Sequence, residues 1–274
     1  MNLGFVTCVQ LGLSCMEAIY DAGYELDIIF TLRDDMAVHK SGRVFVDEFA
    51  KEHGVTVHKL GHVNDTDAVD KYRILDWLFI IGWSQIAGPQ VINAPKRGVL
   101  GIHPTLLPIG RGRAAIPWAI LKGLSKTGVT LFKLDEGVDT GPILAQLEIP
   151  VADNTTATTL YERVNSAHTE LIKQILPKLA AGTYQLVEQD EAKASVWPGR
   201  RPEDGLIDMT GSVCDAERLV RAVTRPYPGA YYLDSAARKV IVWSAAKSDI
   251  RPDTDFLEFK DGYLAILQSE HLSG

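Results

Sequence analysis

The stretch Gly98–Gln146, GVLGIHPTLLPIGRGRAAIPWAILKGLSKTGVTLFKLDEGVDTGPILAQ, decides the fold of this chain. It opens with the apolar run Val99–Ile102, which ends at His103. A second β-rich run, Gly128–Leu134, comes shortly before Asp139, which has a glycine two residues away on either side. Each of these two polar side chains follows a predicted strand, where open α/β sheets build their sites. A histidine and a carboxylate placed in this way suit proton transfer during acyl transfer.

Strand-like and helix-like segments alternate on the N-terminal side of this stretch. Such alternation predicts an α/β fold with a Rossmann-like, mostly parallel sheet. The predicted strands are Leu3–Thr7, Leu26–Leu32, Thr56–Leu60, Trp77–Ile81 and Val99–Ile102. The predicted helices are Ser14–Ala22, with Ser14 as its N-cap, Arg43–Glu52 and Asp65–Tyr72.

On the C-terminal side, Ile143–Ile149 reads as an extended segment and Thr156–Ala181 as a long helix. Apolar residues recur along this helix at steps of three and four and form one stripe: Leu160, Val164, Ala167, Leu171, Ile175 and Leu179. His168 lies off this stripe, so we predict it at the helix surface. Pro177 predicts a kink or break in the last turn, and Gly182 predicts the helix end.

The composition changes at Gln189–Pro202, which is charged, contains two prolines and lacks periodicity. We therefore predict a catalytic domain over 1–190, a linker over 191–205 and a smaller β-rich C-terminal domain over 206–274. In this last domain we expect a helix at Asp215–Val223, strands at Tyr231–Leu233, Lys239–Trp243, Phe256–Phe259 and Tyr263–Gln268, and a hairpin turn at Lys260–Gly262.

The composition excludes several classes of protein. The chain has 274 residues, of which 46% are hydrophobic, so it can bury one large core or two unequal ones. We expect no membrane partner and a cytoplasmic location, because no apolar run is long enough to span a bilayer and three cysteines without a CxxC pair suit a reducing compartment. A net charge of −7 disfavours nucleic acid as a partner. We expect no metal site, because no group of residues has the spacing of metal ligands.

The stretch around His103 resembles the folate-dependent formyltransferases: the methionyl-tRNA, glycinamide ribonucleotide and nucleotide-sugar enzymes. That family shows Asn-x-His-Pro/Ala-Ser/Thr-Leu-Leu-Pro and a downstream Asp-x-Gly, which His103–Pro108, Asp139 and Gly141 match. Residues 201–208 and 221–230 resemble the C-terminal part of the tRNA and sugar branches. The family asparagine falls on Gly101, so one member of the usual catalytic trio is absent.

The resemblance implies that His103 and Asp139 are catalytic and that 10-formyltetrahydrofolate is the co-substrate. It also implies a folate pocket between two loops, formed by Ile81, Gly82 and Trp83 in one and by Asp135, Glu136, Gly137 and Val138 in the other. An irregular loop with apolar walls suits a flat pterin with polar edges. For Trp83, packing in the core remains an equal alternative. In place of the missing asparagine, Ser84, Gln85, Thr105 or a backbone amide could supply the donor.

We assign substrate contacts to Ser14, Gly101, Thr105, Arg111 and Arg113. The two arginines flank a glycine and could clamp a diphosphate or carboxylate, and ion pairing with acidic neighbours is the alternative. Weaker candidates for phosphate contacts are the Lys40–Arg43 loop and Arg200–Arg201.

These assignments lead to one main hypothesis and two alternatives. The main hypothesis is formyl transfer to a primary amine on a nucleotide-linked amino sugar. The resemblance also implies that two copies pair through their C-terminal parts as a homodimer. The first alternative keeps the chemistry and makes methionyl-tRNA the acceptor. The second is a non-catalytic folate- or nucleotide-binding protein, which Gly101 motivates.

Overall fold

A mostly parallel, seven-stranded sheet forms the centre of the N-terminal half. The computed structural model describes residues 1–39 and 42–271. The strand order is β3-β2-β1-β4-β5-β7-β8. The strands are β1 (Leu3–Val6), β2 (Ile28–Leu32), β3 (Thr56–Leu60), β4 (Trp77–Ile80), β5 (Gly98–His103), β7 (Lys126–Lys133) and β8 (Ile143–Pro150). The first five pair in parallel, and β7 runs antiparallel to β5, with His103 opposite Thr130. The predicted α/β, mostly parallel architecture is confirmed.

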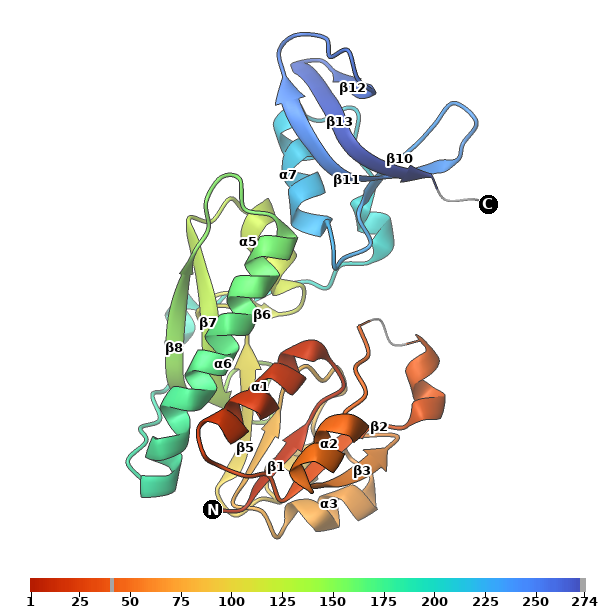
Figure 1. The fold of residues 1–274 in the computed structure, drawn as a ribbon. Coiled ribbons are helices and arrows are strands. Elements are labelled where there is room, and N and C mark those ends of the chain that lie inside the picture. The colour runs from red at the N-terminus through yellow and green to blue at the C-terminus, as the bar shows by residue number, and fades with distance from the viewer. Residues whose placement is uncertain (40–41, 272–274) are drawn as a thin grey trace. The chain divides into compact units, whose positions relative to one another are not determined.

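Helical connections join the parallel strands, as parallel pairing requires. They are α1 (Gln10–Asp21), α2 (Asp47–His53), α3 (Thr66–Tyr72) and α4 (Pro89–Ile92). Figure 1 shows α1, α2 and α3 beside the sheet. Every residue of β1 and β2 is buried, which is why these strands read as continuous apolar runs. A core cluster that includes Phe30, Tyr72 and Leu78 fills the space between sheet and helices.

Two predicted helix starts were wrong. The first helix begins at Gln10, so Ser14 lies inside α1 and accepts a hydrogen bond from the Gln10 side chain at 3.3 Å instead of capping the helix. The second begins at Asp47, because Arg43 is held in extended backbone by a β-bridge to Val9. The Arg43 guanidinium also donates to Thr31 Oγ1.

The long helix α6 (Ala157–Ala181) follows the predicted range, but His168 does not lie at its surface. His168 is only 1% exposed, and its Nδ1 donates to Val164 O at 2.7 Å. Pro177 does not break the helix, which continues to Ala181 and ends before Gly182, where φ is +68°. The prediction of a surface histidine and of a broken last turn was therefore wrong.

The C-terminal residues form a four-stranded antiparallel sheet with one helix. The strand order is β10-β11-β13-β12, and Ser212 caps α7 by accepting a hydrogen bond from Asp215 N. The elements are α7 (Val213–Val223), β10 (Ala230–Leu233), β11 (Lys239–Ser248), β12 (Phe256–Phe259) and β13 (Gly262–His271). The predicted hairpin at Lys260–Gly262 is confirmed, because Phe259 pairs with Gly262.

Several short elements complete the chain. They include α5 (Ala115–Leu121) and three 3-10 turns, none of which was predicted: η1 (Asp34–His39), η2 (Glu191–Lys193) and η3 (Pro202–Gly205). The short strands β6 (Arg111–Gly112) and β9 (Val196–Trp197) pair with each other.

The chain divides into two compact units that are not continuous in sequence. Unit 1 comprises Met1–Arg111, Gly128–Glu148 and Val164–Val196, and unit 2 comprises Gly112–Thr127, Ile149–Arg163 and Trp197–Gly274. The predicted limits at 190 and 205 stay a prediction. No helix within the described residues has the length and apolarity needed to cross a bilayer.

Candidate active site

His103 is the last residue of β5 and lies almost fully buried in unit 1. Its Nε2 lies 2.7 Å from the carbonyl oxygen of Gly110. Because a carbonyl can only accept, Nε2 carries a hydrogen and donates it. Nδ1 is therefore the ring nitrogen that does not contact this carbonyl.

Asp139 lies in the loop between β7 and β8 and directs its carboxylate at that second nitrogen. Asp139 Oδ2 is 3.5 Å from His103 Nδ1. The two side chains keep 19% and 9% of their surface exposed, so neither is sealed from solvent. The structure thus brings together the two residues predicted to be catalytic. A carboxylate at this distance can orient the ring.

The loop that carries Asp139 is held in shape by its own side chains. Asp135 Oδ1 accepts hydrogen bonds from Gly137 N at 3.1 Å and from Thr140 Oγ1 at 2.6 Å. Asp139 itself has φ of +56°, in the left-handed region that few non-glycine residues adopt. Glu136 and Val138 are exposed. The loop is therefore a defined turn that presents Asp139.

The other predicted folate loop follows β4. Ile81 is buried and donates its amide to Val6 O, and Gly82 has φ of +67° with Val9 packed where a side chain would stand. Trp83 is half-buried against the core cluster, and its Nε1 donates to Gln85 Oε1 at 3.1 Å. The Gln85 amide in turn donates to Gly61 O. Gln85 therefore braces this loop, and both readings of Trp83 remain open.

Gly101 lies on β5 two residues before His103 and is buried. A Cβ atom built on Gly101 would come 2.9 Å from Cδ2 of Leu134 and 3.5 Å from Cε1 of Phe132. The Leu134 methyl is the far end of a flexible side chain. The space expected for the family asparagine is therefore partly filled by leucine, and no polar side-chain atom stands among these nearest neighbours.

Thr105 lies just beyond His103 and is 1% exposed. Its carbonyl accepts a hydrogen bond from Thr130 Oγ1 at 2.7 Å. Among the residues that the structure describes, no group hydrogen-bonds to Thr105 Oγ1. A buried hydroxyl without a protein partner carries a desolvation cost, so a ligand that bonded to it would recover that cost.

Arg111 is engaged within the protein. It is 5% exposed, and it donates to Gln189 Oε1 and to both oxygens of Glu191. These hydrogen bonds with Glu191 raise the pKa of Arg111 and lower the pKa of Glu191. In the structure Arg111 therefore follows the alternative prediction, in which it pairs with an acidic neighbour. Sequence reasoning gave Gln189 and Glu191 no role, because they fall in a stretch without periodicity.

The remaining predicted contacts with substrate or phosphate are divided between the two units, and two of these residues lie outside the described part of the chain. Arg113 is exposed and belongs to unit 2, as do Arg200 and Arg201, and Arg200 lies over the Trp118 ring at 5.2 Å. Ser14 is 7% exposed in α1. Lys40 and Ser41 of the predicted phosphate loop lie outside the described residues.

A cavity of about 370 Å³ in unit 1 includes part of the predicted folate loop. Leu134, Asp135 and Glu136 form one part of its lining, and residues between Ile92 and Gly98 form another, with Lys133 beside them. Its volume lies in the range of small-ligand pockets.

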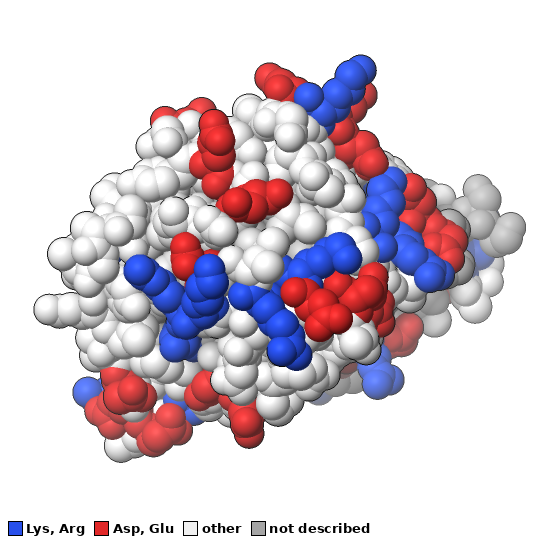
Figure 2. Space-filling view, turned by 90° about the horizontal axis from the view of Figure 1, so that it is seen from below, with Lys and Arg blue, Asp and Glu red and all other residues white. Residues whose placement is uncertain are grey.

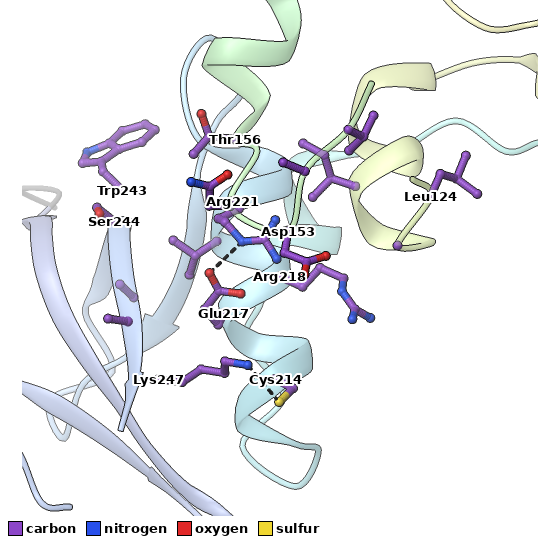
Figure 3. A pocket seen from close by; sticks show the side chains of 18 of the residues that line it. Leu124, Asp153, Thr156, Cys214, Glu217, Arg218, Arg221, Trp243, Ser244 and Lys247 are labelled. Atoms are coloured by element: carbon purple, nitrogen blue, oxygen red, sulfur yellow. Dashed lines mark hydrogen bonds and ion pairs between the residues drawn. The ribbon is translucent and has the colours of Figure 1, made fainter. Parts of the chain in front are cut away.

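A second cavity, of about 1040 Å³, lies within unit 2. Figure 3 shows Cys214, Glu217, Arg218 and Arg221 reaching it from α7, with Lys247 from β11. Arg221 Nε donates to Glu217 at 2.6 Å, and Lys247 Nζ donates to Cys214 Sγ at 3.4 Å. None of the predicted site residues lines this cavity.

Charges of both signs are interspersed on the face shown in Figure 2, where basic side chains stand next to acidic ones. Within the described part of the chain, no three His, Cys, Asp or Glu side chains are grouped so that they could hold a metal ion.

A segment of the chain that contains the pair matches a known family. Residues 45–176, which include the His103–Asp139 pair, match the formyl transferase family model. This segment belongs to the formyl transferase family.

Solved structures of formyltransferases share the fold. One is an N-formyltransferase from Helicobacter canadensis in complex with folinic acid and dTDP-3-aminofucose, with a TM-score of 0.72, 19% identity, and coverage of 98% of this chain and 100% of that one. Another is WlaRD, a sugar 3N-formyltransferase with dTDP and 5-N-formyl-THF, with a TM-score of 0.72, 18% identity, and coverage of 100% and 98%. The methionyl-tRNA formyltransferase from Clostridium thermocellum matches with a TM-score of 0.64, 18% identity and full coverage of both chains.

Proposed function

We propose that this protein transfers a formyl group from 10-formyltetrahydrofolate to a primary amine on a nucleotide-linked amino sugar. The observation that carries the proposal is the 3.5 Å approach of His103 Nδ1, at the end of β5, to Asp139 Oδ2, in the loop between β7 and β8. Both residues lie in the segment that matches the formyl transferase family model. The pair supplies the proton chemistry that amide formation needs.

The reaction has two electrostatic demands. When the amine nitrogen bonds to the formyl carbon, the carbonyl oxygen becomes negative and the nitrogen becomes positive. Protonated His103 would donate its Nδ1 hydrogen toward the oxyanion, and Asp139 would help to accept the proton that the amine releases. As the carbonyl re-forms, the bond from carbon to folate nitrogen breaks and that nitrogen takes up a proton, so the products are tetrahydrofolate and an N-formyl sugar.

A cavity in unit 1 that borders part of the predicted folate loop suits a folate as formyl donor. Leu134, Asp135 and Glu136 border a cavity of about 370 Å³ that Lys96 and Lys133 also line. These two ammonium groups would complement the carboxylates of a folate tail. Two of the structural relatives above were solved with a formylated folate.

The choice of a sugar acceptor rests on charge and on the relatives. Recognition of a tRNA backbone needs clustered cations, whereas this chain has a net charge of −7 and mixed charges on the face seen in Figure 2. The two relatives with the higher TM-scores were solved with dTDP or a dTDP-sugar, whereas the tRNA enzyme has 0.64. Methionyl-tRNA is the second candidate acceptor, because the methionyl-tRNA formyltransferase shares the fold of this chain.

A single-turnover experiment tests the proposal. The protein is mixed with 10-formyltetrahydrofolate and a panel of nucleotide-linked amino sugars, and tetrahydrofolate release and the mass gain of the sugar are followed. We expect one sugar to gain a formyl group. Release with methionyl-tRNA alone would favour the second candidate, and folate binding without any release would favour a binding protein.

Asp139→Asn is the matched variant for this reaction. Asparagine tolerates the left-handed backbone of this position, so the loop should keep its shape while the charge is lost. We expect kcat to fall by about 10²–10⁴-fold. An unchanged kcat in a folded Asp139→Asn protein would remove Asp139 from the mechanism.

A further inference from the structure

One segment, Gln189–Ser195, holds both sides of the His103–Asp139 pair, and we refer to it as the support segment. It begins just after Val187, which pairs with Ile143 at the start of β8 through hydrogen bonds of 2.8 and 2.9 Å. The support segment belongs to unit 1, together with both members of the pair. Sequence patterning placed most of it in a linker.

On the histidine side, Ser195 fixes the peptide that binds the ring. Ser195 Oγ accepts from Gly110 N at 2.9 Å, and Ser195 N donates to Pro108 O at 3.1 Å. Ser195 O accepts from Arg111 N at 2.9 Å. The carbonyl of Gly110 is the acceptor for His103 Nε2. Ser195 therefore sets the position of the group that orients the imidazole.

On the carboxylate side, Gln189 fixes the backbone of the loop. Its Nε2 donates to the carbonyl oxygens of both Asp139 and Gly141, each at 2.8 Å. Asp139 requires such stabilisation, because its backbone φ of +56° is unfavourable for a residue with a Cβ atom. The two hydrogen bonds stabilise the one backbone conformation that aims the carboxylate at His103.

Arg111 sets the direction of the Gln189 amide. Its Nε and Nη2 donate to Gln189 Oε1 at 3.1 and 2.8 Å. Because a guanidinium can only donate, the oxygen of the amide must face Arg111 and the nitrogen must face the loop. The ion pair with Glu191, in the same support segment, holds the guanidinium in place.

We propose that Gln189, oriented by Arg111, and Ser195 are positioning residues that set the spacing between His103 Nδ1 and the Asp139 carboxylate. Their effect on rate rests on the proposed function, whereas their effect on the geometry of the pair does not. A site geometry that loosens by about 1 Å can lose about 10²-fold in rate without losing its substrate affinity.

Kinetics of three variants test the proposal. Gln189→Leu removes both donors to the loop, and Gln189→Glu keeps an acceptor for Arg111 but can no longer donate to the carbonyls. Ser195→Ala removes only the hydroxyl. We expect both Gln189 variants to lose about 10²-fold in kcat, with KM for the folate within about threefold of the unchanged protein. The control is Gln174→Leu, an exposed glutamine on α6 that bonds to Glu170, and it should keep full activity.

A spectroscopic readout separates this proposal from the proposed function. Nitrogen-15 shifts of the His103 ring report the partners of Nδ1 and Nε2 whether or not the protein turns over any substrate. We expect Nδ1 to shift in the Gln189 variants and Nε2 to shift in Ser195→Ala, while the buried His168 ring stays unchanged. Shifted His103 signals in a protein that forms no product would keep the positioning role and reject the function.

The opposite results would overturn the positioning role. Unchanged nitrogen-15 shifts of His103 in all three variants would overturn it. A Gln189→Glu protein with full kcat would also overturn it. A raised KM with unchanged kcat would show that Gln189 serves binding instead. If circular dichroism shows that Gln189→Leu does not fold, Gln189→Glu and Ser195→Ala carry the decision.

Discussion

At the scale of single residues, Gly101 is the position where this chain departs from the family pattern. Glycine provides no side-chain donor for a developing oxyanion, and the Leu134 methyl lies 2.9 Å from where a Cβ would stand. This methyl can move by a change of rotamer, so the fold should accept a larger residue at 101 if Leu134 yields.

We therefore expect Gly101→Asn to raise kcat, by up to the 10²–10³-fold that one oxyanion donor contributes. The rate of formyl transfer to the sugar that the protein accepts measures this change in kcat. Gly101→Ala displaces Leu134 in the same way but adds no donor, so it should not raise the rate. Equal rates for the two variants would show that the missing amide is not what limits this enzyme.

The residues of the site could be predicted from the sequence only where they belong to a local pattern. His103 and Asp139 each follow a strand inside a recognisable motif, and the structure brings them together. Gln189 and Ser195 carry no such signal, because their partners lie about 50 and 85 positions away and no periodicity links them. Arg111 was predicted to bind an anion. Its ion pair with Glu191 could not be predicted, because that pair depends on how a distant segment folds.

At the scale of elements, α6 shows how a helical pattern can be misread. His168 lies four residues after Val164 and three before Leu171, so it belongs to the face that these two apolar residues define. The surface position was predicted because His168 was assigned to a face outside the apolar stripe. In the structure the ring is buried and satisfied by a single hydrogen bond to Val164 O.

This burial makes the stability of the protein depend on pH. Burial lowers the pKa of His168 from 6.5 to about 4. Between these values the unfolded chain binds a proton that the folded chain does not, so the free energy of unfolding falls as the pH drops through this window, in total by roughly 3 kcal/mol. Above pH 6.5 the residue contributes no pH dependence.

Urea unfolding at pH 7.5, 6 and 5 measures the effect. His168→Gln has no titrating group, so its free energy of unfolding should decrease less over this range than that of the unchanged protein. The exposed His271→Gln serves as the control and should follow the unchanged protein. Parallel curves for all three proteins would contradict the role of His168.

The type of β1 and β2 was predictable because every residue of these strands is buried and their runs are short and apolar. Element boundaries that depend on contacts with distant parts of the chain could not be predicted. The short helix α5 has a non-glycine residue, Ala114, with φ of +54° at its start and no side-chain cap, so no local signal marks where it begins.

At the scale of the whole molecule, the compact units do not follow the order of the sequence. Unit 2 combines α5, the start of α6 and the C-terminal sheet with α7. The buried residues Ile116 and Ile120 of α5 and Val220 of α7 all belong to this unit. A cut at a single point in the chain cannot separate the two units.

We therefore expect a fragment ending at residue 190 to fold poorly. It would retain α5 without α7 and would lack Glu191 and Ser195 of the support segment. Dye binding to exposed apolar surface and a broad thermal transition should mark the fragment, whereas the full chain should unfold sharply. A soluble fragment with a sharp transition would instead support an independent domain over 1–190.

The three cysteines differ in their access to solvent, and this difference offers a way to observe unit 2 directly. Cys8 and Cys15 are buried, whereas Cys214 is exposed on α7. A maleimide fluorophore added to the native protein would accordingly attach at one place, beside the Lys247 amine. Emission from that dye would report on the surroundings of the α7 face during the reaction proposed for unit 1, without any engineered thiol.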